Sequence, residues 1–396
     1  MSDAVIIESV RSPGGRYRRG GLASTRSDEM GIQVMKGLLA RVPALKLEDV
    51  DDVICGCAFP EAEQGMNLAM VIAMGAGLPV TVSAMTINRF CSSGLQAIAD
   101  ATAKIRAGWS SVIIAGGCET MSHVPMAGNV YRPHPEWGEN LPYVYVSMGI
   151  TAENVAANYK VSREDQDRFS MESNRKAYEA IKAGRFKEEI IPITAYRYAK
   201  SKSGKRVREQ FVFDTDDGVR WPTTMEGLGR LKSPFKQGGS VTAGNSSQMT
   251  DGAGFTLLMS EEKARSSGLK PVAKLTHYAV AGCKPEEMGI GPAFAIPKVL
   301  KMAGLSTKDI DVFEINEAFA CQALYSIKVV GIEDRLAAGD INPNGGAIAL
   351  GHPLGATGGK LTAQLLYELK RRKAKRGIVS MCIAGGMGAA GIFEML

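Results

Sequence analysis

Cys91 has the sequence context of a reactive thiol. Residues 80–87 before it form an apolar run typical of a strand, and residues 95–105 after it repeat apolar side chains at helical spacing. This pattern predicts that Cys91 lies where a strand leads into a helix N-terminus. Unpaired backbone N–H groups and the positive end of the helix dipole would favour the thiolate there. The alternative is an inert buried cysteine, since free cysteines often behave as small hydrophobic side chains.

Three further residues that could take part in catalysis lie in the last part of the chain. His352 stands in a run of small residues where a second helix is expected to begin. Asn316 follows an expected strand at residues 310–314, and Cys382 lies near the end of another at residues 378–383. An acid or a base beside a nucleophilic thiol is the combination that covalent catalysis requires.

The two ends of the chain repeat one another. Glycines and aspartates recur in the same order at an offset of about 260 residues, in the pairs Gly31 and Gly291, Asp51 and Asp311, and Gly94 and Gly355, and the same offset relates Cys91 to His352. Four matches in order indicate an internal duplication. Each half is interpreted as a β/α unit with a mixed, mostly parallel sheet. Cys91 and His352 would then occupy equivalent helix N-termini near the carboxyl edge of the sheet, where such folds bind ligands.

The segment between the repeats breaks this pattern. Residues 122–251 contain several prolines, a long charged helix expected at residues 164–183, a basic loop and glycine-rich turns. We therefore predict an N-terminal half at residues 1–121 and 252–270, an inserted loop domain at residues 122–251, and a C-terminal half at residues 271–396. The inserted loop domain either forms a lid over the active site or serves only to stabilise the fold.

Composition excludes several classes of function. The 396 residues are 45% hydrophobic and 22% charged, which is typical of a globular protein of two or three units. The net charge of +6 does not indicate a nucleic-acid partner. Two basic clusters, at residues 197–208 and 370–376, are interpreted as solvated loops and helix ends, or as attraction for an anionic small ligand. The four histidines do not suggest a zinc site.

The chain carries the signs of a cytoplasmic protein. Its seven cysteines are odd in number and lack a disulfide spacing, which favours a reducing compartment. Residues 1–10 are read as a strand and not as a signal peptide, and no apolar run is long enough to span a membrane. The C-terminal residues 394–396 are not the peroxisomal signal.

Taken in order, these motifs closely resemble the thiolases, the acyl-CoA:acetyl-CoA C-acyltransferases. The resemblance covers essentially the whole chain, and its most specific parts are the glycine-rich string around His352 and the run that begins with Asn316 and Glu317. It implies an α/β fold of two duplicated β/α halves, with mixed sheets stacked in an α-β-α-β-α arrangement and an inserted loop domain that forms a lid for CoA.

The resemblance also assigns roles to the candidate residues. It implies that Cys91 attacks the keto carbon of a 3-ketoacyl-CoA and keeps the shortened acyl group, and that His352 accepts the Cys91 proton. Cys382 would give a proton to the departing acetyl-CoA carbanion, or remove one in the synthetic direction. A water held by Asn316 would stabilise one oxyanion with His352. Backbone N–H groups of Cys91 and Ala384 would stabilise the other, although many thiolases have glycine at the latter position.

Contacts to CoA are implied for two residues of the insert. Arg220 would meet the adenine and phosphate end, and Ser247 would contact the pantetheine amide. Met148 and Met288 would flank the acyl thioester, or simply pack in the core. Short-chain biosynthetic thiolases often have histidine at the position of Ser147, so its absence favours a degradative enzyme.

The implied function is thiolytic cleavage of 3-ketoacyl-CoA, as in fatty acid β-oxidation, with CoA as co-substrate and without a metal or a permanently bound cofactor. A homodimer or homotetramer is expected, with a possible hydratase/dehydrogenase partner. The alternatives are a short-chain acetoacetyl-CoA thiolase and a non-catalytic protein that binds CoA or lipid. A ketoacyl synthase is disfavoured because it uses two histidines, whereas Cys382 and Asn316 occupy the corresponding motifs here.

Overall fold

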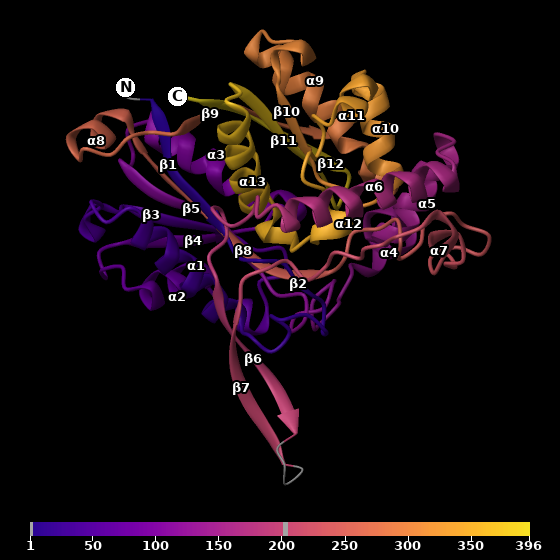
Figure 1. The fold of residues 1–396 in the computed structure, drawn as a ribbon, viewed down its shortest axis with the longest axis horizontal. Helices are drawn as coiled ribbons and strands as arrows, with labels where there is room; N and C mark the ends of the chain where they lie inside the picture. Colours follow the sequence, from indigo (N-terminus) through magenta and orange to yellow (C-terminus); the bar gives the residue numbers. More distant parts are fainter. Residues whose placement is uncertain (1–2, 201–204) are drawn as a thin grey trace.

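One mixed sheet runs through the whole molecule. The computed structural model describes residues 3–200 and 205–396. Ten strands join in the order β10-β11-β12-β9-β1-β8-β5-β3-β4, with β2 paired to β8 (Figure 1). The N-terminal half contributes β1 (Ala4–Arg11), β2 (Gly15–Arg16), β3 (Asp52–Gly56), β4 (Ser83–Ile87), β5 (Val112–Glu119) and β8 (Thr250–Ser260). The C-terminal half contributes β9 (Ala273–Gly282), β10 (Val312–Ile315), β11 (Arg376–Ile383) and β12 (Met387–Met395).

Strand order confirms the duplication. The order β3-β5-β8-β1 in the first half matches β10-β11-β12-β9 in the second, and in each set the first pair is parallel and the next two are antiparallel. The equivalent strands β1 and β9 join the halves through the single pair Ile6 and Ala273. The expectation of a mostly parallel sheet was wrong, because β8 and β12 each run antiparallel to both neighbours.

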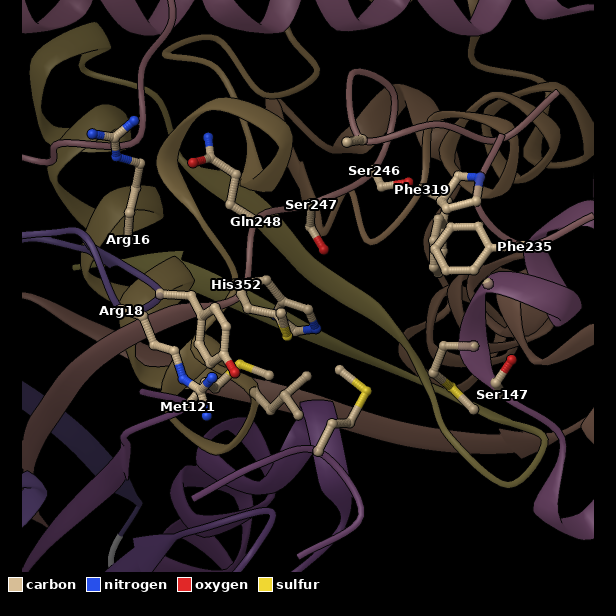
Figure 2. A pocket seen from close by; sticks show the side chains of 18 of the residues that line it. Arg16, Arg18, Met121, Ser147, Phe235, Ser246, Ser247, Gln248, Phe319 and His352 are labelled. Atoms are coloured by element: carbon tan, nitrogen blue, oxygen red, sulfur yellow. The ribbon is translucent and has the colours of Figure 1, made fainter. Parts of the chain in front are cut away.

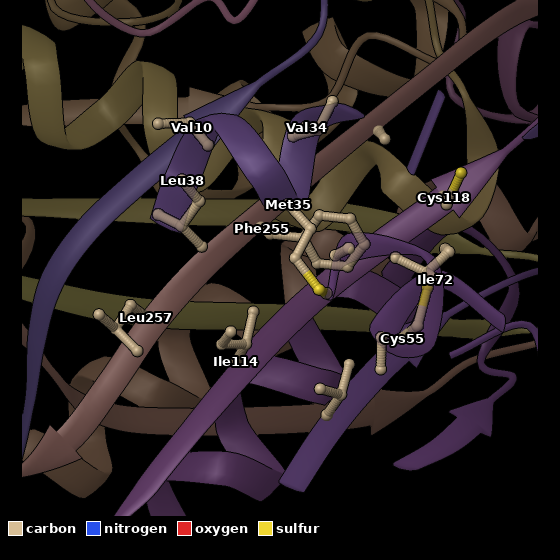
Figure 3. Close-up of a cluster of buried hydrophobic side chains, with 14 of the residues drawn as sticks. Val10, Val34, Met35, Leu38, Cys55, Ile72, Ile114, Cys118, Phe255 and Leu257 are labelled. Carbon is tan, nitrogen blue, oxygen red and sulfur yellow. The ribbon is translucent and has the colours of Figure 1, made fainter. Parts of the chain in front are cut away.

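Helices form three layers around the two halves of the sheet. Helices α1 (Ser27–Arg41) and α2 (Leu68–Ala76) cover the outer face of the first half, where their apolar side chains pack on β3, β5 and β8 (Figure 3). Helices α3 (Ser93–Arg106) and α13 (Thr357–Arg372) lie between the halves, and α9 (Gly291–Ala303) and α10 (Ala320–Val330) cover the outer face of the second. Three separate apolar clusters fill these interfaces, as the predicted α-β-α-β-α order requires.

The segment between β5 and β8 adds its own elements. These are α4 (Pro135–Asn140), α5 (Met148–Asn158), α6 (Arg163–Lys182), α7 (Met225–Gly229) and a hairpin of β6 (Ile193–Lys200) and β7 (Arg206–Phe213). The hairpin projects away from the body in Figure 1 and carries much of the basic cluster at 197–208, of which residues 201–204 lie outside the described residues. Short helices α8 (Glu261–Ser266), α11 (Glu333–Ala338) and α12 (Ala347–Leu350) complete the fold.

A buried ion-pair network ties this segment to the sheet. Arg11 at the end of β1 is fully buried, and its guanidinium contacts Glu189 at 2.7 Å and Asp216 at 2.8 Å. Removing Arg11 would leave two carboxylates in the interior without their cation, and breaking a buried ion pair in this way typically costs about 3–5 kcal/mol. The described part of the chain holds no helix that is long and apolar enough to cross a membrane.

Helices α3 and α13 touch at their N-termini without room for side chains. A Cβ built on Gly358 would lie 1.9 Å from the backbone nitrogen of Leu95, and one on Gly94 would lie 2.8 Å from the nitrogen of Gly359. These are backbone atoms, which cannot turn aside as a side chain can. Glycine is therefore required where the two helices begin.

We expect Gly358→Ala to lower the free energy of unfolding by about 1–3 kcal/mol, the usual effect of overpacking a tight interface. Gly138→Ala in α4 is the matched control, because a Cβ there meets nothing within 4 Å. Equilibrium denaturation in urea measures both. Equal stability of the two variants would show that the helix contact tolerates a methyl group.

Candidate active site

Cys91 lies in a short 3-10 turn, Phe90–Ser92, that leads directly into α3. Its thiol is buried and packs with Ala58, Met121 and Leu354. Burial raises the pKa of Cys91 to about 12, although the backbone N–H groups of Ala384 and of Cys91 itself act to lower it. The expected thiolate is therefore wrong for the resting protein, because loss of hydration outweighs the helix N-terminus.

His352 is a neutral base in this environment. It precedes the short turn Leu354–Ala356 that opens α13, the position equivalent to that of Cys91. Burial lowers the pKa of His352 to about 3, and the charge of Lys360 acts in the same direction. Its Nδ1 lies 2.6 Å from Oγ1 of Thr357, whose hydroxyl donates to the carbonyl of Pro353. This network assigns the proton to Nδ1 and leaves Nε2 free to accept one.

Asn316 and Cys382 complete the group from the C-terminal half. The Nδ2 atom of Asn316 lies 3.4 Å from Nε2 of His352, while its Oδ1 is buried without a hydrogen-bond partner among the described residues. Cys382 lies at the end of β11 and is fully buried. Burial raises the pKa of Cys382 well above its usual range, and the charge of Cys91 adds to this effect. The two thiols are thus close enough to influence each other.

The turn after Cys382 approaches the first thiol. Residues 384–386 connect β11 to β12, and Gly385 and Gly386 adopt φ values of 83° and 88°, which favour glycine. This shape presents the N–H of Ala384 to Cys91, where it acts to lower the pKa of the thiol. Met288 is buried beside Cys382 and Phe319. The backbone N–H groups of Ala384 and Cys91 thus both act on the Cys91 thiol.

A cavity of about 790 Å³ opens above these residues. His352, Arg220, Ser247 and Met148 line it, whereas Cys91, Cys382 and Met288 lie behind the lining. Figure 2 shows Arg16 and Arg18 at one end, Phe235, Phe319 and Ser147 at the other, and Ser247 and His352 between them. The structure therefore brings the predicted residues of both halves and of the insert to one place.

Sequence reasoning missed a carboxylate that holds the two catalytic loops together. Glu119 at the end of β5 is buried, and its Oε2 accepts hydrogen bonds from the N–H groups of Ala58 at 2.7 Å and Gly355 at 2.8 Å. Ala58 packs against Cys91, and Gly355 follows His352 in the same turn. An acidic residue that ends an otherwise apolar strand was the available signal.

Comparison with known proteins agrees with this geometry. A family model described as the thiolase N-terminal domain matches residues 4–262, and one described as the thiolase C-terminal domain matches residues 269–395. Together the two matches span both halves of the sheet and the segment between β5 and β8.

Relatives of known name and structure point the same way. The chain is 51% identical over 395 residues to a 3-ketoacyl-CoA thiolase of Bacillus subtilis, covering 100% of both chains. It is 44% identical to a peroxisomal 3-ketoacyl-CoA thiolase of Arabidopsis thaliana, covering 99% of this chain and 85% of that one.

Two solved structures share the fold. The Bacillus anthracis acetyl-CoA acetyltransferase is 38% identical with a TM-score of 0.89, and the match covers 100% of this chain and 99% of that one. The dimeric peroxisomal thiolase of Saccharomyces cerevisiae gives the same identity and TM-score, over 100% of this chain and 98% of that one. With a nucleophile and a base at equivalent points of two repeated halves, and with these matches over its whole length, the chain belongs to the thiolase family of acyltransferases.

Proposed function

We propose that this chain is a 3-ketoacyl-CoA thiolase, an acyl-CoA:acetyl-CoA C-acyltransferase that works through an acyl group on Cys91. The observation that carries the proposal is the meeting of a neutral His352 and two buried thiols beneath one cavity. The names of the Bacillus subtilis and Arabidopsis thaliana relatives support the substrate class. A fatty acid β-oxidation role follows from that class.

Acylation begins with proton transfer. His352 accepts the Cys91 proton on Nε2, and the sulfur attacks the keto carbon of the 3-ketoacyl-CoA. The N–H groups of Cys91 and Ala384 stabilise the oxyanion that forms there. Because burial opposes a free thiolate, Cys91 passes its proton to His352 as its sulfur attacks the electrophile.

Cys382 serves the second proton transfer. When the bond between the α and β carbons breaks, the acetyl-CoA enolate takes a proton from the Cys382 thiol. The enolate oxygen is stabilised by His352 and by a water held at the unpartnered Oδ1 of Asn316. The thiol of a second CoA then gives its proton to the Cys382 thiolate and attacks the acyl group on Cys91; the shortened acyl-CoA leaves, and the Cys91 sulfur takes its proton back from His352.

The insert at residues 122–251 supplies the CoA contacts in this proposal. Ser247 lines the middle of the cavity for the pantetheine arm (Figure 2), and Arg220 is a further lining residue, for the nucleotide. Met148 lines the cavity and Met288 packs beside Cys382, so both lie near the acyl thioester. No permanently bound cofactor is part of this mechanism.

Two features bear on substrate size and compartment. Ser147 lines the cavity beside Met148, and a serine in this place supports a degradative enzyme. The alternative is the short-chain acetoacetyl-CoA activity that the Bacillus anthracis acetyl-CoA acetyltransferase suggests.

All seven cysteines are free, which supports the proposed cytoplasmic location in a reducing environment.

A chain-length series tests the function. Purified protein with CoA and 3-ketoacyl-CoA substrates should release acetyl-CoA, with kcat/KM rising beyond the four-carbon substrate. A preference confined to acetoacetyl-CoA would instead support the short-chain alternative. Absence of acetyl-CoA release with every substrate would leave a non-catalytic CoA-binding protein.

Cys382→Ala separates the two thiols in the same assay. It should still form the Cys91 acyl-enzyme from acyl-CoA, as seen by intact mass, because that step moves no proton to or from carbon. It should lose thiolysis and α-deuterium exchange into acetyl-CoA by at least about 10²-fold, the usual contribution of a general acid or base. Cys321→Ala is the matched control, since this buried thiol contacts the carbonyl of Ala152 instead. Loss of acylation with exchange intact would reverse the two roles.

The pKa of His352 gives a pH prediction. Because it is lowered to about 3, the imidazole is neutral throughout the physiological range, and the rate of Cys91 alkylation by iodoacetamide should stay nearly constant between about pH 5 and pH 8. In His352→Asn the rate should fall at pH 7 by about 10²–10⁴-fold and rise with pH, following the thiol pKa of about 12. A wild-type rate that drops through pH 6.5 would mean that His352 titrates as an ordinary histidine.

We infer that two copies of the chain join along β4. This strand forms one edge of the sheet, and its Met85 and Ile87 are only partly buried. Unpaired edge strands readily pair with another chain, and the Saccharomyces cerevisiae relative is dimeric. Light scattering at micromolar concentration should therefore give a dimer or a dimer of dimers. A monomer with full activity would rule out an obligatory interface.

A further inference from the structure

The rim of the active-site cavity carries four arginines from two distant segments. Arg16 is the last residue of β2, Arg18 and Arg19 lie in the turn that follows it, and Arg220 comes from the stretch before α7. Within residues 3–200 and 205–396, no carboxylate lies within ion-pair distance of Arg18, Arg19 or Arg220. Four positively charged side chains thus line one cavity, with little neutralisation by nearby carboxylates.

Asp217 fixes Arg16 and Arg220 beside each other. Its carboxylate accepts the N–H of Arg16 at 2.8 Å and the N–H of Gly21 at 2.7 Å, and its own N–H donates to the carbonyl of Gly14. Asp217 stands three positions before Arg220 in the sequence. Strand β2 is in turn paired with β8 at Arg16 and Thr250, so the turn is built into the sheet.

The two guanidinium groups repel each other in the free protein. Partial burial lowers the pKa of Arg220, and the charge of Arg16 lowers it further. The Nε of Arg16 is buried without a hydrogen-bond partner among the described residues, and its distance to Asp217 is 4.0 Å. A cation with an unused donor, held close to a second cation, is the arrangement that a multiply charged anion would stabilise.

We propose that Arg16 is a second phosphate-binding residue for CoA, which grips the nucleotide end together with Arg220. The inference rests on the proposed function, because the acyl chain and the pantetheine arm of the substrate are uncharged and only the nucleotide phosphates carry negative charge. Arg16 reaches the cavity from the N-terminal half and Arg220 from the insert, so the nucleotide would be held from both sides.

Arg18 and Arg19 have a different part in this arrangement. Both are exposed, and the guanidinium carbon of Arg18 lies 4.9 Å from the centroid of the Tyr17 ring. They add to the positive potential that draws an anion to the opening, which salt screens. Arg16 is only partly exposed and lines the cavity, and its guanidinium is the group that makes the contact.

The test compares three ligands by isothermal titration calorimetry, in the absence of an acyl substrate. These are CoA, dephospho-CoA, which lacks the 3′-phosphate, and pantetheine, which lacks all phosphates. Arg16→Gln should raise the Kd of CoA by about tenfold or more, as expected for one charge-assisted contact. Its effect on the Kd of pantetheine should be less than about twofold, since no phosphate remains to be contacted.

Two variants serve as controls. Arg16→Lys keeps a positive charge and should recover part of the CoA affinity, and Arg265→Ala removes an exposed arginine from α8, outside the cavity lining, and should change none of the three values. A penalty for CoA alone assigns Arg16 to the 3′-phosphate, and an equal penalty for dephospho-CoA assigns it to the diphosphate. An unchanged Kd for CoA, or an equal loss for pantetheine, overturns the proposal.

This outcome is separable from the thiolase activity itself. If the wild-type protein cleaves 3-ketoacyl-CoA while Arg16→Gln binds CoA normally, only the role of Arg16 fails. If the wild-type protein binds CoA through Arg16 but cleaves no 3-ketoacyl-CoA, the proposed reaction fails and the phosphate contact stands.

Discussion

The direct backbone contact between the starts of α3 and α13 is the constraint on which the site depends. Gly94 and Gly358 bring the two helices together without intervening side chains. Cys91 precedes one helix and His352 the other, so the contact limits the distance between these two side chains, which are the nucleophile and the base of the proposed mechanism. Glu119 reinforces it by hydrogen bonding to both loops. A wider spacing would leave two separate polar pockets in place of one reactive pair.

Burial then decides the protonation of this pair. The same loss of hydration raises the pKa of Cys91 and lowers that of His352, because burial destabilises the charged form of each group. The resting site therefore holds a neutral thiol and a neutral imidazole. In the proposed mechanism the charges separate only as the sulfur of Cys91 attacks an electrophile and its proton moves to His352. A thiol that stays protonated at rest is less open to oxidants.

Local patterns in the sequence predicted the elements well. The apolar spacing at residues 95–105 predicted the helix that follows Cys91, and α3 spans Ser93–Arg106. The repeat of Gly94 in Gly355 also revealed the duplication, which strand order confirms. Long-range effects were beyond reach: the sequence does not show how deeply Cys91 is buried. Nor does it show that Asp217 holds the backbone at Arg16 close to Arg220, because this placement depends on hydrogen bonds between segments that are distant in the sequence.

The position of β12 has a consequence for synthesis of the chain. This strand comes after all the others in sequence, yet it lies inside the sheet, hydrogen bonded to β11 on one side and β9 on the other. On the ribosome, the sheet of the second half therefore stays open until β12 emerges. The turn that presents the Ala384 N–H to Cys91 forms only when β11 and β12 pair as a hairpin. A growing chain thus carries Cys91 long before the N–H of Ala384 is in place beside it, and in the proposed mechanism acyl transfer has to wait for the last strand.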